Sequence, residues 1–255
     1  MAEKNASLVG HLGELRKRLM LIAFFFVIAI AGSFFFVRPI YQFMTKDLTE
    51  KLVVLGPADF VWIYFTLAFV IATAVMIPVI AWQIWLFVSP ALKEKERKTA
   101  LLYIPALFIL FIAGICFGYF GILPFLLKFL KEFSEGMVIA TYTVDKYFSF
   151  ILRITVPFGF LFEMPLVMMF LTSIRVLNPH VISKIRKYCY FVLVIIAILL
   201  TPPDFFAQTI VSIPLIILFE ISVVISKIVY KRQQKRDAQD AAALAADTIG
   251  SEEEK

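Results

Sequence analysis

Long apolar segments separated by short polar links make up most of this chain. Six such segments stand out, at residues 19–37, 60–88, 101–127, 148–174, 188–200 and 210–228. The hydrocarbon core of a bilayer is about 30 Å thick and needs about 20 helical residues to cross it. The pattern therefore predicts an all-α integral membrane protein with six transmembrane helices, of which the fifth and the sixth are short.

The fifth segment, 188–200, is the least regular of the six. Its run of about 13 apolar residues rises only about 20 Å as a helix. Lys184, Arg186 and Lys187 precede it, and long basic side chains can extend toward the headgroups from inside a membrane. We interpret the segment as a span, with a re-entrant segment as the alternative. Prolines inside several other segments predict kinked helices, which neighbouring helices can tolerate in lipid.

Lys and Arg are distributed unevenly over the links. They cluster before the first span, in the links after the second and fourth spans, and after the sixth span, whereas the remaining links hold fewer bases and also carry acids. Links rich in Lys and Arg stay on the cytoplasmic side of a membrane. The pattern therefore places both the N-terminus and the C-terminus in the cytoplasm.

The composition agrees with a membrane protein. Hydrophobic residues make up 61% of the chain and charged residues 17%, whereas a soluble domain carries about 25% charged residues. We interpret the net charge of +6 as anchoring at an anionic membrane face, and we expect no nucleic-acid partner. We expect two parts: a six-span membrane domain at 1–230, and a mobile cytoplasmic tail at 231–255 that changes from basic to alanine-rich to acidic.

Motifs for catalysis or cofactor binding are missing from the sequence. The two cysteines and two histidines lack the spacing of a metal site. Phosphate-binding glycine loops, HExxH and GxSxG are also missing. We therefore expect no cofactor, no metal and no enzymatic activity, and any transport work must draw on an energy source other than nucleotide hydrolysis.

Two acids lie inside apolar segments. Glu163 is in the fourth segment and Glu220 is in the sixth. An ionised carboxylate in lipid costs a few kcal/mol, so each should face protein or water. Each either forms a polar site for a ligand, a partner helix or a proton, or is a protonated acid bonded to a backbone carbonyl that a nearby proline leaves free.

A series of short motifs runs in order along residues 8–226. The motifs are His11-Leu12-x-Glu14-Leu15-Arg16-x-Arg18-Leu19, then Trp85-x-Phe87-x-x-Pro90-Ala91-Leu92 with Glu96-Arg97, Phe158-Gly159-x-x-Phe162-Glu163-x-Pro165, Thr201-Pro202-Pro203-Asp204 with Gln208, and Leu218-Phe219-Glu220. In this order they resemble the TatC family, the multi-spanning core subunit of the twin-arginine protein translocase. The family often has a proline in the first extracytoplasmic loop, and residues 43–46 contain none.

The resemblance implies a fold, a function and partners. It implies six spans in the bacterial cytoplasmic (inner) membrane, with both ends of the chain on the cytoplasmic side. It also implies export of folded proteins that carry twin-arginine signal peptides, driven by the proton-motive force, in a larger complex with other copies and with single-span TatA and TatB proteins. It assigns signal-peptide binding to Glu14, Arg16, Phe87, Glu96 and Arg97, intramembrane polar or partner contacts to Glu163, Gln208 and Glu220, and an extracytoplasmic turn to Pro202, Pro203 and Asp204.

Other classes of membrane protein remain possible from the residues alone. A proton-coupled secondary transporter would use Glu163 as its coupling site, and a structural scaffold would need no such site. An intramembrane enzyme lacks a visible nucleophile and base. Reconstitution separates these classes, because a transporter moves a small solute alone whereas a translocase receptor binds a peptide and needs partners.

The charge distribution generates a labelling prediction. In a background without Cys116 and Cys189, cysteines at Thr49, Gly136 and Phe206 should react with an impermeant thiol reagent added outside the cell. Cysteines at Ala6, Thr99 and Ser251 should not, because the basic links face the cytoplasm. Labelling of position 99 from outside would contradict this orientation.

Overall fold

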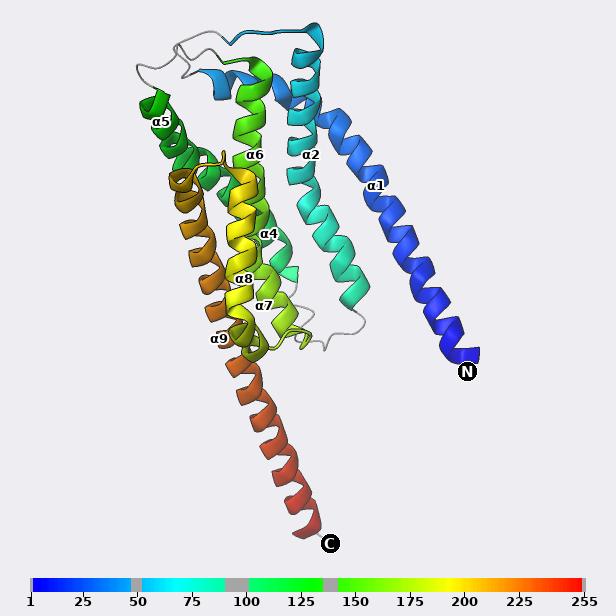
Figure 1. Ribbon diagram of the computed structural model, residues 1–255. Helices are drawn as coiled ribbons and strands as arrows, with labels where there is room; N and C mark the ends of the chain where they lie inside the picture. The colour runs from blue at the N-terminus through cyan, green and yellow to red at the C-terminus, as the bar shows by residue number, and fades with distance from the viewer. Residues whose placement is uncertain (1, 47–51, 90–100, 135–141, 254–255) are drawn as a thin grey trace. The chain divides into compact units, whose positions relative to one another are not determined.

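The computed structural model describes residues 2–46, 52–89, 101–134 and 142–253, and these are mainly helical (Figure 1). The helices are α1 (Ala2–Thr45), α2 (Pro57–Val88), α4 (Tyr103–Cys116), the π-helical segment η2 (Phe117–Ile122), α5 (Leu123–Ser134), α6 (Val144–Phe162), α7 (Met164–Ser173), α8 (Pro179–Leu200) and α9 (Phe205–Glu253). They form two compact units, Met1–Phe162 and Glu163–Lys255.

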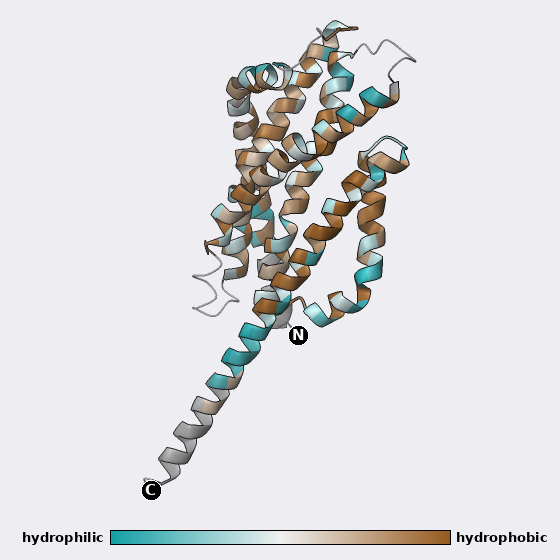
Figure 2. Ribbon diagram, turned by 90° about the vertical axis from the view of Figure 1, so that its left-hand side faces the viewer, coloured by the Kyte–Doolittle hydropathy of each residue, from teal (hydrophilic) through white to brown (hydrophobic). Residues whose placement is uncertain are grey.

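Five helical segments within the described residues are long and apolar enough to cross a membrane. They are Gly13–Thr45, Pro57–Val88, Tyr103–Phe133, Val144–Ser173 and Phe205–Gln239. Most residues of these segments are hydrophobic (Figure 2). The expectation of an all-helical membrane fold is thus confirmed, whereas the count of six spans and the orientation of the termini stay predictions.

Each of the two apolar segments expected to form a short span lies within a longer helix. Helix α8 has 22 residues and begins at Pro179, where the Asn178 side chain accepts a hydrogen bond from the backbone N–H of His180 at 3.0 Å. It is therefore longer than its apolar run, because its first half carries the basic residues. The candidate span Phe205–Gln239 has 35 residues, because α9 continues as a helix on both sides of the apolar run at 210–228.

Glycine allows helices of the first unit to approach closely. A Cβ atom on Gly114 of α4 would lie 2.5 Å from the carbonyl oxygen of Phe158 on α6, and one on Gly118 would lie 2.9 Å from the Cα of Thr155. Small residues four apart are a common device for close helix packing in membranes. Gly114 and Gly118 therefore bring the backbones of the third and fourth apolar segments into contact.

Two prolines coincide with irregular helix geometry. The π-helical segment η2 lies just before Pro124, and the backbone N–H of Leu123 donates to the carbonyl of Gly118, five residues earlier. A second interruption separates α6 from α7 at Glu163, which precedes Pro165. Proline cannot donate the usual backbone hydrogen bond and crowds the preceding turn. These interruptions agree with the expectation of irregular, proline-containing spans.

The segment after α1 is held in place without the proline that is frequent in the family. The backbone N–H of Val53 donates to the Tyr142 carbonyl at 3.1 Å, and the N–H of Val144 donates to the Val53 carbonyl at 2.9 Å. The buried hydroxyl of Tyr147 donates to the Met44 carbonyl at 3.2 Å. Hydrogen bonds from the start of α6 and the residues before it therefore hold Val53 and the end of α1, near the position where the family often has a proline.

The second unit consists of α7, α8 and α9, and α9 lies beside both of the others (Figure 1). The hydroxyl groups of Thr172 on α7 and Ser226 on α9 lie 2.6 Å apart and are buried. Helix α9 runs through the domain boundary expected at residue 230 without a break and ends at Glu253. Residues 231–253 are thus helical, and their mobility stays a prediction.

Close packing at Gly114 generates a stability prediction. Gly114→Ala should cost about 1–3 kcal/mol, because the added Cβ overlaps backbone atoms of α6. The matched control is Gly32→Ala, since nothing lies within 4 Å of a Cβ at that position. Thermal unfolding of the purified protein in detergent should show a lower Tm for Gly114→Ala alone. Equal Tm values for both variants would contradict the close approach of α4 and α6.

Candidate functional site

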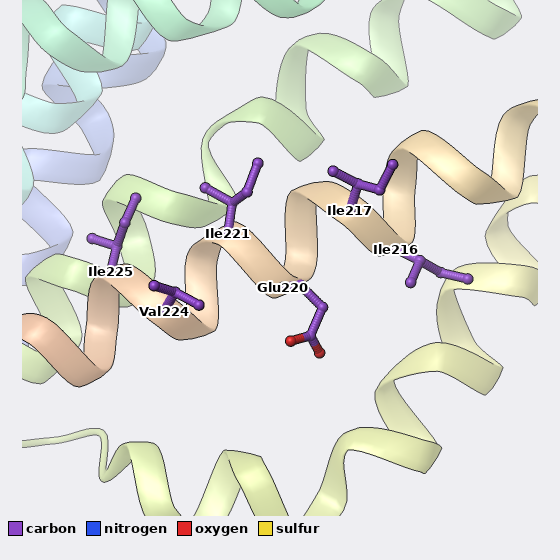
Figure 3. A pocket seen from close by; sticks show the side chains of 6 residues that line it. All are labelled: Ile216, Ile217, Glu220, Ile221, Val224 and Ile225. Carbon is purple, nitrogen blue, oxygen red and sulfur yellow. The ribbon is translucent and has the colours of Figure 1, made fainter.

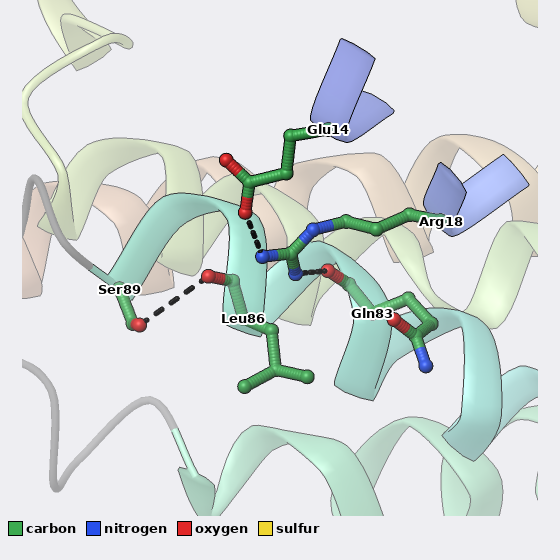
Figure 4. A network of polar contacts seen from close by, with 5 residues as sticks. All are labelled: Glu14, Arg18, Gln83, Leu86 and Ser89. Carbon is green, nitrogen blue, oxygen red and sulfur yellow. Dashed lines mark hydrogen bonds and ion pairs between the residues drawn. The ribbon is translucent and has the colours of Figure 1, made fainter. Parts of the chain in front are cut away.

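A polar cluster joins the first part of α1 to the last part of α2 (Figure 4). One guanidinium nitrogen of Arg18, Nη1, donates to the backbone carbonyl of Gln83 at 2.9 Å, and Nη2 donates to a carboxylate oxygen of Glu14. The guanidinium carbon of Arg18 also lies 5.7 Å from the centre of the Phe87 ring. We call Glu14, Arg18, Gln83 and Phe87 the Glu14 cluster.

Helical spacing explains how these residues meet. Glu14 and Arg18 are four residues apart on α1, and Gln83 and Phe87 are four residues apart on α2. Residues at this spacing lie on the same helix face. Because α1 and α2 pack along each other, each helix contributes one such pair to the contact.

Glu14 retains free capacity to bind a cation. Its side chain is 44% exposed, whereas that of Arg18 is only 18% exposed. The second carboxylate oxygen of Glu14 points away from Arg18 (Figure 4). A carboxylate has about four acceptor positions, so Glu14 can accept another guanidinium while Arg18 holds it in place. Arg18 therefore acts as a bridge between the helices and positions Glu14.

The other residues assigned to the same site are not all in the cluster. Arg16 is exposed on α1, and two residues from Glu14 it projects from a different face of the helix. Phe87 is in the cluster through its contact with Arg18. Glu96 and Arg97 lie outside the described residues.

A second polar cluster connects α8 and α9. The hydroxyl of Tyr190 donates to one carboxylate oxygen of Glu220, and a guanidinium nitrogen of Arg186 lies 3.3 Å from the other. The side chains of Arg186 and Glu220 are 32% and 33% exposed. A phenol and a guanidinium thus share the charge of an acid that stands among apolar residues, which lowers the cost of placing it there.

An apolar groove lies beside Glu220 along α9 (Figure 3). Its volume is about 360 Å³, and its lining residues all come from α9: Ile216, Ile217, Glu220, Ile221, Val224 and Ile225. Glu220 supplies the acidic side chain of this lining. The groove therefore combines apolar surface with one acid whose charge is already shared.

Glu163 differs from the other two acids. Both of its carboxylate oxygens are buried, and neither has a hydrogen-bond partner among the described residues. A buried polar group without a partner is costly. The alternative in which this acid bonds a backbone carbonyl freed by a proline is therefore not found in the part of the chain that the structure describes.

Residues of the predicted turn have local structural roles. Pro202, Pro203 and Asp204 connect α8 to α9, and the Asp204 carboxylate accepts a hydrogen bond from the backbone N–H of Ala207 at 2.9 Å. This bond caps the start of α9. Gln208 lies in the next turn of α9, about 18 Å along the helix axis from Glu220. Gln208 and Glu220 therefore do not form one polar site.

Sequence reasoning missed the residues that hold the acids. Arg18 could have been found from its spacing of four residues after Glu14. Arg186 and Glu220 lie equally far before and after Pro203, so a helical hairpin with its turn there brings them together. No such spacing marks Tyr190. Gln83 has no sequence signal either, because it contributes only its backbone carbonyl.

The described residues contain no group of three or more His, Cys, Asp or Glu side chains that could hold a metal ion. Cys116 and Cys189 are free thiols.

Comparison with known proteins identifies similar chains. Residues 10–214 match the family model described as Sec-independent protein translocase protein (TatC). TatCd of Bacillus subtilis (strain 168) is 48% identical over 242 residues, which are 95% of this chain and 100% of TatCd. TatCy of the same organism is 41% identical over 244 residues, or 94% of this chain and 96% of TatCy. A crystal structure of the twin arginine translocase receptor TatC is similar at a TM-score of 0.75 and 32% identity, and the match covers 86% of this chain and 99% of that one.

Proposed function

The chain belongs to the TatC family of Sec-independent protein translocase proteins and is therefore a membrane component of a Tat protein-transport system, within which we propose that it is the core subunit that binds twin-arginine signal peptides. The observation that supports this role is the Glu14 carboxylate. It is about half exposed, it is held by Arg18, and its second oxygen points away from that partner.

Recognition rests on the geometry of guanidinium and carboxylate. A guanidinium is a planar fork whose N–H groups match a carboxylate, whereas an ammonium group is a point charge without this geometry. Glu14 accepts one arginine of the signal peptide, and Glu96 in the following link accepts the other. Phe87 offers its ring to a neighbouring guanidinium, as it already does to Arg18. The family resemblance also assigns Arg16 and Arg97 to this site, and in the sequence they lie two residues and one residue after the two acids.

The proposed topology has six spans and two cytoplasmic ends in the bacterial inner membrane. Helix α8 is the fifth span. Its 22 residues extend about 33 Å as an α-helix, which exceeds the bilayer core of about 30 Å. Lys184 and Lys187 lie near its start and mark the cytoplasmic side, while Arg186 turns toward Glu220.

The proposed partners are single-span TatA- and TatB-type proteins and further copies of this chain. Polar side chains stabilise helix contacts in lipid by hydrogen bonding across the interface. The two buried oxygens of Glu163 have no hydrogen-bond partner in the part of the chain that the structure describes, and Glu220 lines an apolar groove. Both acids, with Gln208, therefore offer polar contacts to a partner helix. Export of folded cargo draws on the proton-motive force, in keeping with the lack of a nucleotide-binding motif.

Signal-peptide affinity tests the proposed binding site. A hydrogen bond to a charged group contributes about 1.5–3 kcal/mol, so Glu14→Ala and Glu96→Ala should each weaken binding about 10- to 150-fold. Glu94→Ala is the matched control in the same link and should have much less effect. Binding should weaken with added salt, and a signal with Lys-Lys in place of Arg-Arg should bind poorly. The measurement uses the purified protein in nanodiscs.

Two outcomes would contradict this site. Normal binding by Glu14→Ala and Glu96→Ala would place the recognition surface elsewhere on the protein. Loss of binding by Glu94→Ala with normal binding by Glu96→Ala would shift the second acid by two positions.

Glu163 provides a separate test of the intramembrane contact. Glu163→Gln keeps a polar group and should retain insertion and most export, whereas Glu163→Ala should weaken export and partner association more than folding. Export can be followed with a reporter protein that carries a twin-arginine signal. Wild-type export by both variants would make the acid a structural group only. A clear loss for Gln as well as Ala would favour a proton or charge role, which is also what a proton-coupled transporter requires.

A further inference from the structure

One face of α9 is joined to α7, to the turn that follows α7 and to the start of α8. The joined residues recur at helical spacing, and we call Ser226, Tyr230, Gln233 and Asp237 the latch face. Their contacts are Ser226 with Thr172 at 2.6 Å, the Tyr230 ring with the His180 ring at 5.6 Å between centres, the Gln233 amide donating to the Ser173 carbonyl at 2.6 Å, and both Asp237 oxygens accepting from Arg175 at 2.7 and 2.9 Å. The first part of the segment after residue 230 is therefore docked.

The turn that receives the latch has an unusual residue at its centre. Arg175 has a φ of 62°, a conformation that non-glycine residues rarely adopt. Its N–H donates to the Thr172 carbonyl, and the N–H of Val176 donates to the Leu171 carbonyl, both at 3.0 Å. This is the helix ending at which glycine is usual. An arginine here directs its guanidinium to Asp237, which a glycine could not do.

The opposite face of the same segment is basic. Lys231, Arg232, Lys235 and Arg236 are all exposed. At about 100° per residue they lie on the side of α9 that faces away from the latch residues. Figure 2 shows hydrophilic residues where α9 leaves its apolar part. The latch face and the basic face thus divide one short helical segment between two surfaces.

Depth relative to the membrane narrows the choice of partner. The apolar run of α9 ends at Ile228, which is 47% exposed. The four basic residues follow at about 4 to 12 Å along the helix axis, and the headgroup region extends about 5–8 Å beyond each side of the hydrocarbon core. Lys231 and Arg232 therefore lie at headgroup depth, and the long side chains of Lys235 and Arg236 can reach back to it. The basic face is therefore continuous with a surface that faces lipid tails.

We propose that the latch face holds this segment so that Lys231, Arg232, Lys235 and Arg236 form a docking surface for anionic phospholipid headgroups. Phosphate oxygens accept hydrogen bonds from Lys and Arg, and clusters of such residues just beyond a span bind anionic lipids. Arg175 also pairs with Asp237, so the charge of this acid is balanced from the latch side and not by the four basic residues. The inference is independent of signal-peptide binding.

Photoreactive lipids test this surface on the full-length protein in vesicles. The probes are phosphatidylglycerol and phosphatidylcholine with the same photoreactive acyl chain, and the readout is the ratio of their adducts on residues 228–239. Each removed charge should lower the ratio by up to about fivefold, so changing all four basic residues to Gln should lower it more than tenfold. Inorganic phosphate should not compete. The control Lys128→Gln, on α5, should leave the ratio unchanged.

The latch is tested by a variant in which charge and orientation predict opposite results. Gln233→Ala combined with Asp237→Asn removes an acid, so charge alone predicts a higher ratio. The proposed orientation predicts a ratio lower by about two- to threefold, with Gln234→Ala as the matched control on the exposed side. A higher or unchanged ratio for the latch variant, or an unchanged ratio for the fourfold variant, would overturn the proposal. Unchanged adducts on α1 would show that each variant is folded.

Discussion

A carboxylate beside lipid needs another group to share its charge, and this requirement organises the polar residues of this protein. Arg18 shares the charge of Glu14 and at the same time binds the backbone of α2. Tyr190 and Arg186 share the charge of Glu220. Glu163 lacks such a group among the described residues. Glu14 and Glu220 thereby join neighbouring helices, and the second oxygen of Glu14 still points away from Arg18. We propose that Glu163 is used by a partner helix or a proton.

Irregular helices make these arrangements possible. Gly114 and Gly118 let α4 and α6 approach to backbone contact, and the carbonyls displaced by proline create breaks such as the one at Glu163. In water such breaks would be costly, but in a membrane neighbouring helices can satisfy the groups that are set free. Glu14 and Glu220 both lie within helices, where each carboxylate contacts a fixed partner and keeps part of its side chain exposed.

Much of the fold could be predicted from the apolar runs, because each run long enough to cross a bilayer became a helix. Helix ends could not be predicted from them. Helix α9 continues past its apolar run because alanine, lysine and glutamine also favour helix, and hydropathy does not report this. Glu14 could be assigned through its motif, but its bridge to α2 depends on a backbone carbonyl, which no side-chain pattern marks. The pairing of Tyr190 with Glu220 depends on the register of a hairpin, and only the position of its turn hints at that register.

The central claim is that a signal peptide meets this protein at the Glu14 cluster. The most direct measurement places a photoreactive phenylalanine derivative at Phe87 and, as a control, at Phe35 of α1, which is 84% exposed. After illumination with a twin-arginine signal peptide, the account predicts an adduct at position 87, none at position 35, and a loss of the adduct when both peptide arginines become lysine. An adduct of equal yield at both positions, or one at position 87 that persists with the lysine peptide, would contradict it.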